Sequence, residues 1–519
     1  MMGPPLTPKM VPTMTDPTAS VGEPDLFPEQ DDDFAREKQP ITARGVAIVG
    51  GRVATGLIGI GVAVAAIAAA TFIPLPTVQA VPGSMVITPV PTAQQLVCPG
   101  AILRLADDSG QGATTASAIG RPSIDSSSSV GQVASSPLDQ SDASTGATAS
   151  APTIISALPD QADPAAQILL SGAQAQLSDE GDFVGLTAAG CATVSGDVWL
   201  AAGSTSVGRT TLLTLSNPTE VPATVNIELY GENGRVTAPG TSGIVVPASG
   251  QRVISLAGFQ PDLASTVVHV TSSGGQVVAA LQQSTVRGLV PGGIDIVGPT
   301  VAPQLDTVIP GVLVTDLVAV QELQGGGEAF EDLRTVIRLF APGEGTIPVT
   351  ISVVSEDGAA PGASFVFQLD AGRVVDLPVG ELDNGSYTVR ASAEVPTLAT
   401  VRVSSAVAEA TDFAWLVAAP ELPAPAQLTI APGPSPQLHL YNPTDVDITV
   451  VLTATEGGDL SVPVPARTAA VVPVTAGASY VLSGYEKLQA SVTVVEGGMI
   501  AGYTVHPPGV GSSPLTIYR

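Results

Sequence analysis

The chain has 519 residues, a formal net charge of −28 and an apolar content of 44%. A surface this acidic repels phosphate backbones, which excludes nucleic acid as the expected partner, while the apolar content is sufficient for a folded core. With 55 glycines, 46 prolines and charged residues at only 13%, the composition favours many short strands joined by turns.

Residues 1–52 are rich in proline, contain the acidic run Asp31–Asp33 and have few apolar side chains. A segment of this composition cannot bury enough apolar surface to offset the entropy lost on ordering. We expect residues 1–52 to form a disordered cytoplasmic leader.

Residues 53–73 form an apolar run without a charged side chain, long enough for a helix to cross the hydrocarbon core of a bilayer, which is roughly 30 Å thick. Positive charge stays on the cytoplasmic side of a membrane helix. The sequence therefore predicts a single-pass transmembrane helix at the cell membrane, with the N-terminus cytoplasmic and the C-terminal ectodomain extracytoplasmic. The basic residues that set this orientation are Arg36, Lys38, Arg44 and Arg52.

A second interpretation of the same segment is a cleaved signal peptide. Small residues at Val78 and Ala80 resemble a signal peptidase site, and cleavage after Ala80 would release the ectodomain. The length of the leader and of the apolar run favours the uncleaved anchor. Both interpretations place the remaining chain outside the cytoplasm.

Cys98 and Cys191 are the only cysteines, and both follow the predicted anchor. Thiols on the outer side of a membrane are oxidised and not reduced again, so we expect a Cys98–Cys191 disulfide. The two cysteines bracket a region that we assign to residues 74–204. Within it, residues 107–153 are rich in Ser, Ala, Gly and Thr without apolar periodicity, which predicts a flexible loop whose glycosylation stays open.

Three blocks after residue 204 share one layout of short apolar runs and turns. Each begins with a strand ending in an Asn-Pro-Thr or Ala-Pro-Gly turn, continues with an alternating strand and closes with a hairpin. Alternation such as Val225, Ile227 and Leu229 places one face of a strand in a core. We therefore expect a mostly β fold with tandem immunoglobulin-like or fibronectin-like antiparallel β-sandwiches. The expected boundaries are residues 205–300, 301–420 and 421–519.

Two Asn-Pro-Thr turns recur at corresponding places in the first and third blocks. The proline that follows Asn217 and Asn442 excludes both residues as glycosylation acceptors. Asn-Pro pairs favour turn initiation, so we expect both asparagines to stabilise turns.

The run CATVSGDVWLAAGSTSVGRTTLLTLSNPT from Cys191 to Thr219, with the VCPG segment at residues 97–100 and the apolar anchor, resembles a large actinobacterial family of uncharacterised membrane-anchored extracytoplasmic proteins. The resemblance covers most of residues 53–519. It implies a cell-envelope location and a β-sandwich ectodomain. It implies no catalytic residues, because the family is itself of unknown function.

The chain offers few residues for catalysis or metal binding. His269, His439 and His506 fall in separate stretches, and no zinc-protease, serine-hydrolase or nucleotide-binding string occurs. We therefore expect no cofactor, no metal and no enzymatic activity. Trp199 and Trp415 are expected to fill sandwich cores, and the alternative for both is stacking on a glycan.

The sequence thus predicts a non-enzymatic interaction or scaffolding protein of the cell envelope. Its partner would be an envelope protein or polysaccharide, and its membrane contact would be the N-terminal helix. An envelope glycan-binding module is the alternative. A weaker one is an envelope glycan hydrolase, which needs two carboxylates about 5 to 10 Å apart in a cleft. Oligomeric state and calcium dependence stay open at this point.

Overall fold

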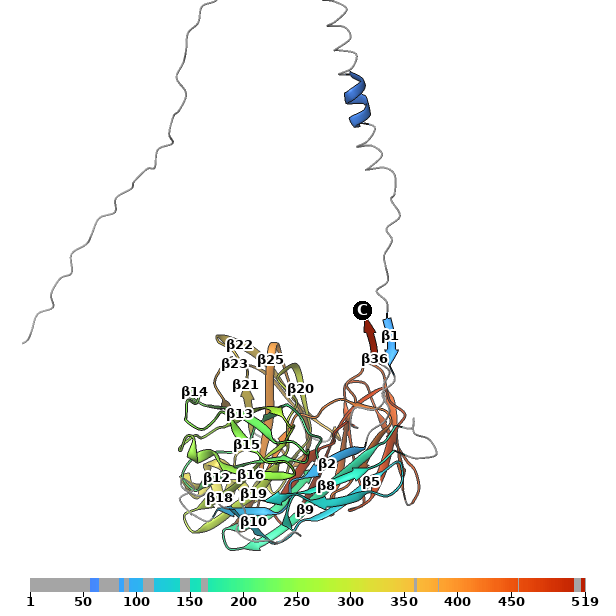
Figure 1. Cartoon of the computed structure of the whole chain (residues 1–519). Coiled ribbons are helices and arrows are strands. Elements are labelled where there is room, and N and C mark those ends of the chain that lie inside the picture. Colours follow the sequence, from blue (N-terminus) through green and yellow to red (C-terminus); the bar gives the residue numbers. More distant parts are fainter. Residues whose placement is uncertain are drawn as a thin grey trace, which may run out of the picture. The chain divides into compact units, whose positions relative to one another are not determined.

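The computed structural model describes ten ranges of the chain, in two compact units, Met1–Gly83 and Ser84–Arg519 (Figure 1). In the first unit, residues 57–64 form a helix. Within the described ranges, no helix has the length and apolar character that crossing a membrane requires. The leader 1–52 and the rest of the predicted span 53–73 lie outside them. The described ranges are residues 57–64, 84–87, 93–105, 116–140, 150–159, 167–358, 362–380, 382–455, 457–507 and 515–518.

The three predicted blocks form antiparallel β-sandwiches with one common strand order. In the first, one sheet has the order β11-β17-β13-β14, with β15 also on β13, and the facing sheet has the order β19-β18-β12-β16. Because β11 pairs with β17, this sandwich begins before the predicted residue 205. Its strands are β11 (Asp197–Leu200), β12 (Arg209–Asn217), β13 (Ala223–Gly231), β14 (Gly234–Arg235), β15 (Ile244–Val246), β16 (Gly250–Ser255), β17 (Val267–Gly274), β18 (Val278–Arg287) and β19 (Val290–Val297), and the short 3-10 helix η2 (Leu256–Gly258) follows β16.

The second sandwich repeats this order with one long strand shared between its sheets. The first part of β25 pairs with β20 and β22, and its second part pairs with β21 and β26. Two short helices lie between β20 and β21. The elements are β20 (Gln304–Val314), α2 (Leu317–Gly325), η3 (Glu328–Leu333), β21 (Val336–Phe340), β22 (Thr346–Ser355), β23 (Ala363–Asp370), β24 (Val375–Pro378), β25 (Gly385–Val407) and β26 (Ala410–Val417).

The third sandwich has a sheet of order β28-β33-β30-β31 facing a sheet in which β34 pairs with β27, β29 and β35, and β29 pairs with β32. Near the end of the chain, β36 (Leu515–Tyr518) pairs with β1 (Ser84–Ile87). The strands of the sandwich are β27 (Leu422–Pro423), β28 (Ala426–Thr429), β29 (Gln437–Tyr441), β30 (Ile448–Ala454), β31 (Leu460–Val464), β32 (Ala469–Pro473), β33 (Ser479–Ser483), β34 (Lys487–Glu496) and β35 (Met499–Thr504).

The region before the first sandwich is also built of strands, and the Cys98–Cys191 disulfide forms as predicted. The predicted flexible loop 107–153 is wrong for residues 116–140, which contain β4 to β7. Their small side chains hide the apolar periodicity of a strand but fit between close neighbours: Ser127 bonds to Ser171 and to Thr429 of the third sandwich. The strands are β2 (Gln94–Cys98), β3 (Ile102–Leu105), β4 (Ala116–Ile119), β5 (Ser123–Ser128), β6 (Ala134–Pro137), β7 (Asp139–Gln140), β8 (Thr153–Ala157), β9 (Leu170–Glu180) and β10 (Phe183–Gly190).

Asn217 and Asn442 stabilise equivalent turns, as the sequence predicts. Each amide nitrogen donates to three backbone carbonyls, among them Val221 O at 2.8 Å for Asn217 and Val446 O at 2.8 Å for Asn442. Each amide oxygen accepts from the backbone N–H and the hydroxyl of the threonine two residues later. The same network at two distant sites shows that the first and third sandwiches are built as repeats.

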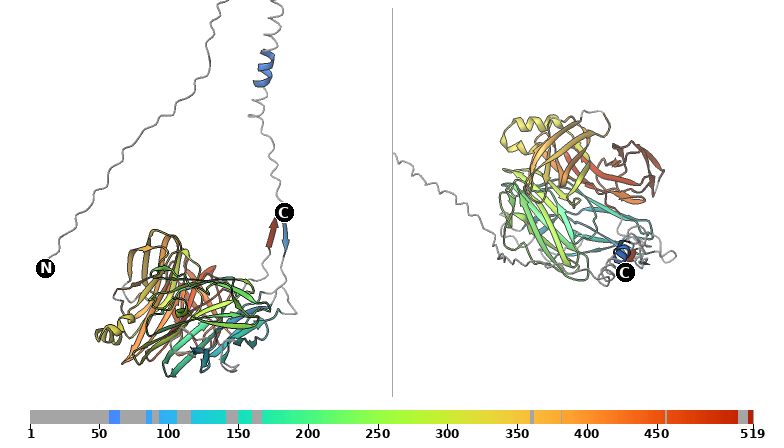
Figure 2. Two further views of the ribbon diagram at one scale, coloured as in Figure 1. Left: turned by 60° about the vertical axis from the view of Figure 1, so that its left-hand side comes forward. Right: turned by 90° about the horizontal axis from the view of Figure 1, so that it is seen from above.

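Four strands, β10, β19, β26 and β35, surround one axis of the second unit, and we call them the central strands. Each is the last strand of a hairpin, and β19 contacts β10 and β26 while β35 contacts the same two strands from the other side. Figure 2 (right) shows the four parts of the chain, in teal, green, yellow to orange and red, grouped around this centre. The sandwiches are therefore joined through one junction and are not separate domains arranged in a row.

Alternating side chains of the central strands enter neighbouring cores. On β26, Phe413 and Trp415 pack in the core of the first sandwich, whereas Ala414 and Leu416 pack in the core of the second. Leu186 of β10 packs in the core of the third sandwich. A strand with period two presents residues to both faces, so each central strand ties two cores together.

The carboxyl group of Asp412 lies at the axis and is fully buried. Its Oδ2 accepts hydrogen bonds from the N–H of Leu186 at 2.9 Å and of Ile500 at 3.2 Å, and its Oδ1 accepts from the N–H of Ile294 at 3.1 Å. One side chain of β26 thus binds the backbone of all three other central strands. A Cβ on Gly185 or Gly293 would come within 2.7 Å of Oδ1, so both positions have room only for glycine.

Replacement of Asp412 by alanine is expected to lower the unfolding free energy by about 3 kcal/mol or more. Three buried N–H groups would lose their acceptor, and each buried, unpaired group costs about 1 to 3 kcal/mol. Urea unfolding of Asp412→Ala and of the exposed control Asp445→Ala measures this, and the control should change by about 0.5 kcal/mol at most. A loss as small as that of the control would contradict a joining role for Asp412.

Stability should also depend on pH through Asp412. Burial raises the pKa of Asp412 to about 7, although the backbone N–H groups favour its charged form. In the unfolded chain an aspartate has a pKa near 3.9, so between about pH 4 and pH 7 the folded chain holds a proton that the unfolded chain has lost. The unfolding free energy should therefore fall as pH rises through this window. In Asp412→Asn the fall should be shallower, and an equally steep fall would refute the assignment.

Candidate functional site

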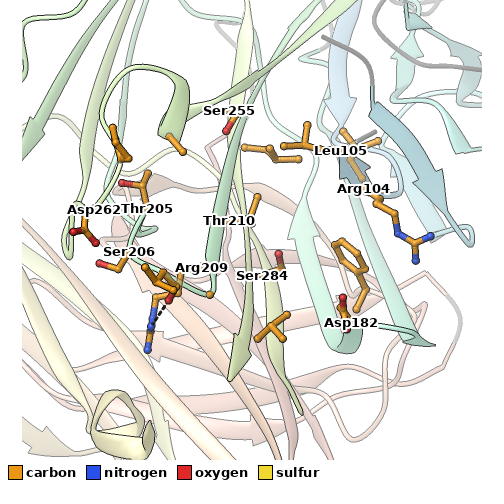
Figure 3. A pocket seen from close by; sticks show the side chains of 18 residues that line it. Arg104, Leu105, Asp182, Thr205, Ser206, Arg209, Thr210, Ser255, Asp262 and Ser284 are labelled. Carbon is orange, nitrogen blue, oxygen red and sulfur yellow. Dashed lines mark hydrogen bonds between the residues drawn. The ribbon is translucent and has the colours of Figure 1, made fainter. Parts of the chain in front are cut away.

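A groove with a volume of about 650 Å³ lies between the region before the first sandwich and the first sandwich itself (Figure 3). One wall comes from β3 and from the turn between β9 and β10. The opposite wall comes from the loop between β11 and β12, from β12, and from the segment after η2. Since strands and tight turns form its walls, the groove is held by the same hairpins that meet at the axis.

The loop before β12 is fixed by hydrogen bonds within the first sandwich. Thr205 donates its hydroxyl proton to Gln260 O at 2.8 Å and accepts from the N–H of Leu263 at 2.9 Å. Gly208 has φ +75°, and a Cβ there would collide with the carbonyl oxygen of Val286. These contacts hold the loop against the rest of the sandwich and keep its polar side chains at the groove.

Hydroxyl groups dominate the polar lining of the groove. They come from three separate segments, and Figure 3 shows them around the space between the walls. The Thr205 hydroxyl proton is already donated to Gln260 O, while the other hydroxyl groups of this lining suit a ligand that itself carries many hydroxyl or amide groups. The hydroxyl side chains are those of Thr205, Ser206, Thr210, Ser255 and Ser284.

Arg209 lies at one end of the groove and belongs to a cationic cluster. Its Nη2 lies 3.0 Å from Asp332 Oδ2, and Arg287 and Arg402 contact the same oxygen at 2.8 and 3.2 Å. Burial raises the pKa of Asp332, but the surrounding guanidinium groups, Arg402 foremost, hold it well below its usual value. One carboxylate is surrounded by three guanidinium groups here, and of these three arginines Arg209 lines the groove while Arg287 and Arg402 are buried behind it.

The other wall combines an aromatic ring with a second arginine. The guanidinium carbon of Arg104 lies 5.3 Å from the centre of the Phe183 ring, and its Nη2 lies 3.6 Å from Glu180 Oε1. Phe183 is half-buried and lines the groove. Arg104 lies over the Phe183 ring, which also packs against an apolar cluster, so this wall combines a guanidinium group with the side of an aromatic residue.

Two acids also line the groove. Asp182 lies in the turn between β9 and β10, and Asp262 lies in the segment before β17. Figure 3 places them on opposite sides of the space, Asp262 near Thr205 and Asp182 on the side of Arg104. If the protein were a glycan hydrolase acting in this groove, these two aspartates would be its carboxyl groups.

The structure places both tryptophans in apolar cores. Trp199 is 9% exposed and stacks on His269 with ring centres 4.1 Å apart. Trp415 is 3% exposed, lies against the guanidinium of Arg338 and donates its ring N–H to Gln283 at 2.7 Å. Neither ring has a face free for a glycan, so the aromatic candidate for glycan contact moves to Phe183.

A Glu356, His439 and Thr493 relay joins the second and third sandwiches. His439 Nδ1 lies 2.5 Å from Glu356 Oε2, and His439 Nε2 lies 2.8 Å from the Thr493 hydroxyl. Burial raises the pKa of Glu356, but His439 together with the hydrogen bonds from Gly311 and Thr388 outweighs this, and the net direction is downward. The order acid, imidazole, hydroxyl is that of a catalytic triad. Because all three groups are buried, we interpret the relay as a contact between sandwiches.

Residues 141–433 match the model of a family of unknown function, DUF5719. The chain belongs to the DUF5719 family. The matched range includes the β12 side of the groove, Asp182, Phe183 and the Asp332 cluster. Arg104 lies before it. No curated protein and no solved structure matches the chain significantly.

Sequence reasoning did not identify the groove of this DUF5719 protein. Thr205, Ser206 and Arg209 stand in the GSTSVGR stretch that carries the family resemblance, yet their spacing alone suggests only a turn before a strand. Arg104, Asp182 and Phe183 come from distant segments that the fold brings to the opposite wall. Only the register of β9 with β10, and the packing of β3 beside them, places these side chains together.

Gly208→Ala tests whether the loop geometry is required. The left-handed backbone and the nearby carbonyl of Val286 leave no space for a methyl group, so we expect a stability loss of about 1 to 3 kcal/mol. Thermal unfolding measures it. Gly240→Ala is the matched control, because Gly240 also has positive φ but nothing within 4 Å of its Cβ position. Equal losses in the two variants would show that backbone conformation alone, and not the contact with Val286, limits residue 208.

Proposed function

We propose that this DUF5719 protein is a non-enzymatic interaction or scaffolding protein of the cell envelope. In this proposal residues 53–73 anchor it in the cell membrane, the N-terminus is cytoplasmic, and Ser84–Arg519 lies outside. The observation that carries the proposal is the junction of four central strands on Asp412. A junction with shared cores makes a rigid body, which suits a protein that holds partners at fixed positions.

The burial of the reactive groups supports a non-enzymatic role. The catalytic-triad-like relay at His439 is closed to substrate. In the described part of the chain, no cluster of three His, Cys, Asp or Glu side chains has the arrangement of a metal site. Within the groove, hydrolysis would have to rest on Asp182 and Asp262, which come from opposite sides of it.

Glycan binding in the groove is the second candidate, and the lining favours it. Hydroxyl side chains, the Phe183 ring and two arginines together resemble the mix of hydrogen-bonding and flat apolar surface that saccharides bind. The cationic cluster at Arg209 would select a polymer with carboxylate or phosphate groups. The partner would then be an envelope polysaccharide in place of a protein.

Co-sedimentation of the purified unit Ser84–Arg519 with isolated cell envelopes separates the candidates. Binding lost after the polysaccharides are stripped indicates a glycan partner, and binding lost only after protease treatment of the envelopes indicates a protein partner. Polymer shortening that disappears in Asp182→Asn or Asp262→Asn would contradict the non-enzymatic proposal. Absence of binding to untreated envelopes would contradict both interaction proposals.

The groove is tested in the same assay by Arg104→Ala. Loss of a charge-assisted contact should weaken polysaccharide-dependent binding about tenfold, since such a bond contributes on the order of 1.5 kcal/mol. Arg235→Ala is the matched control, because Arg235 is also an exposed arginine paired with a glutamate, Glu228, but lies outside the groove lining. Equal binding by the two variants would place the ligand elsewhere.

A further inference from the structure

The strand at one sheet edge differs in length and sequence among the three sandwiches. The equivalent strands β13, β22 and β30 each pair on their outer side with one further strand, which we call the outer strand. In the first sandwich this outer strand is β15, with three residues, and in the third it is β31, with five residues and a proline at position 463. In the second sandwich it is β23, with eight residues and no proline.

The outer side of β23 has no partner among the described residues. β23 pairs with β22 and ends the sheet order β23-β22-β25-β21-β24. Figure 1 shows β22 and β23 at the margin of the unit, away from β5 and β9. A sheet edge of this kind presents a row of backbone N–H and C=O groups that can pair with another strand.

β23 also lacks the features that normally protect an edge. Natural edges are shortened, or carry proline or inward charges, as β15 and β31 do by length and by Pro463. The sequence of β23, ASFVFQLD, is apolar and aromatic, with a single charge at its last residue, Asp370. Val366 at its centre is 59% exposed, while Phe365 and Phe367 pack half-buried against the core of the second sandwich.

We propose that β23 is a self-association surface, at which two copies of this chain pair their β23 strands antiparallel about Val366. In this register Val366 faces Val366 of the second copy, and Phe365 faces Phe367. Strands paired this way keep their core-facing sides on the same face of the joined sheet. The aromatic residues then form two cross-strand pairs, which stabilise antiparallel pairing.

Charge along the strand itself does not oppose a second copy as the occupant. In this register Asp370 lies opposite Gly362, so the two Asp370 carboxylates stand at opposite ends of the ladder, about 25 Å apart. That separation exceeds the Debye length of about 8 Å at physiological salt, so they do not repel appreciably. Every other facing position joins uncharged side chains. The strand is therefore complementary to itself without any further segment.

The association should be weak and dependent on concentration. A single strand pair buries less surface than the roughly 1,200 to 2,000 Å² of stable interfaces. We expect a monomer-dimer equilibrium with a dissociation constant on the order of micromolar to tens of micromolar. This inference does not depend on the groove or on the nature of its ligand.

Sedimentation velocity of the unit Ser84–Arg519 over a concentration series tests the proposal. Wild type should shift from monomer to dimer, whereas Val366→Lys and Val366→Glu should each stay monomeric, because like charges would face each other across the two-fold axis. An equimolar mixture of the two variants should dimerise again, since opposite charges then face each other. This recovery also shows that neither variant has simply misfolded.

Val354→Lys is the matched control, because Val354 is 50% exposed on the neighbouring strand β22 but does not lie on the free edge. It should dimerise like wild type. A wild type that stays monomeric at the highest concentration, a Val366→Lys variant that dimerises like wild type, or a mixture that fails to recover would each overturn the proposed pairing.

Discussion

The carboxyl group of Asp412 binds the backbone of the three strands that surround it, and the rest of the second unit is arranged around these bonds. Each bond joins β26 to a hairpin from a different part of the chain. Backbone N–H groups at such a junction need an acceptor, because the central strands do not pair with one another in sheets. Gly185 and Gly293 leave the space that the acceptor occupies. The packing of these four hairpins therefore depends on one buried side chain.

The shared cores explain why the sandwiches do not behave as independent domains. Each central strand presents one set of alternate residues to one core and the other set to its neighbour, as Phe413 and Ala414 do on β26. The groove lies at one of the boundaries that these strands create, between the β9–β10 hairpin and β12. Two of the hairpins that meet at the junction, β9–β10 and β18–β19, contribute residues to its walls.

Sequence patterns predicted the local structure well where period-two alternation or a turn signal was strong. The mostly β fold, the Cys98–Cys191 disulfide and the Asn-Pro-Thr turns at Asn217 and Asn442 are all present. The strands β4 to β7 were not predicted, because Ser and Ala differ too little in hydrophobicity to show the alternation of a strand. The N-terminal span 53–73 extends beyond the described residues and stays a prediction.

The junction and the groove could not be predicted from the sequence for a different reason. Asp412 gains its role from N–H groups, which every non-proline residue carries, so no residue pattern identifies its partners. Arg104 and Phe183 are far from Arg209 in the chain, and they line the same groove only because the region before the first sandwich packs against that sandwich. Trp199 and Trp415, in contrast, are buried, in keeping with the core positions expected for them from the sequence.

Hydrogen exchange measured by mass spectrometry on Asp412→Asn tests the central claim most directly. The account predicts that peptides covering β10, β19 and β35 lose protection together with β26, although the substitution lies on β26 alone. The exposed variant Asp445→Asn should leave all four peptides protected. Faster exchange confined to β26, with β10, β19 and β35 unchanged, would contradict the claim that this one side chain holds the four hairpins together.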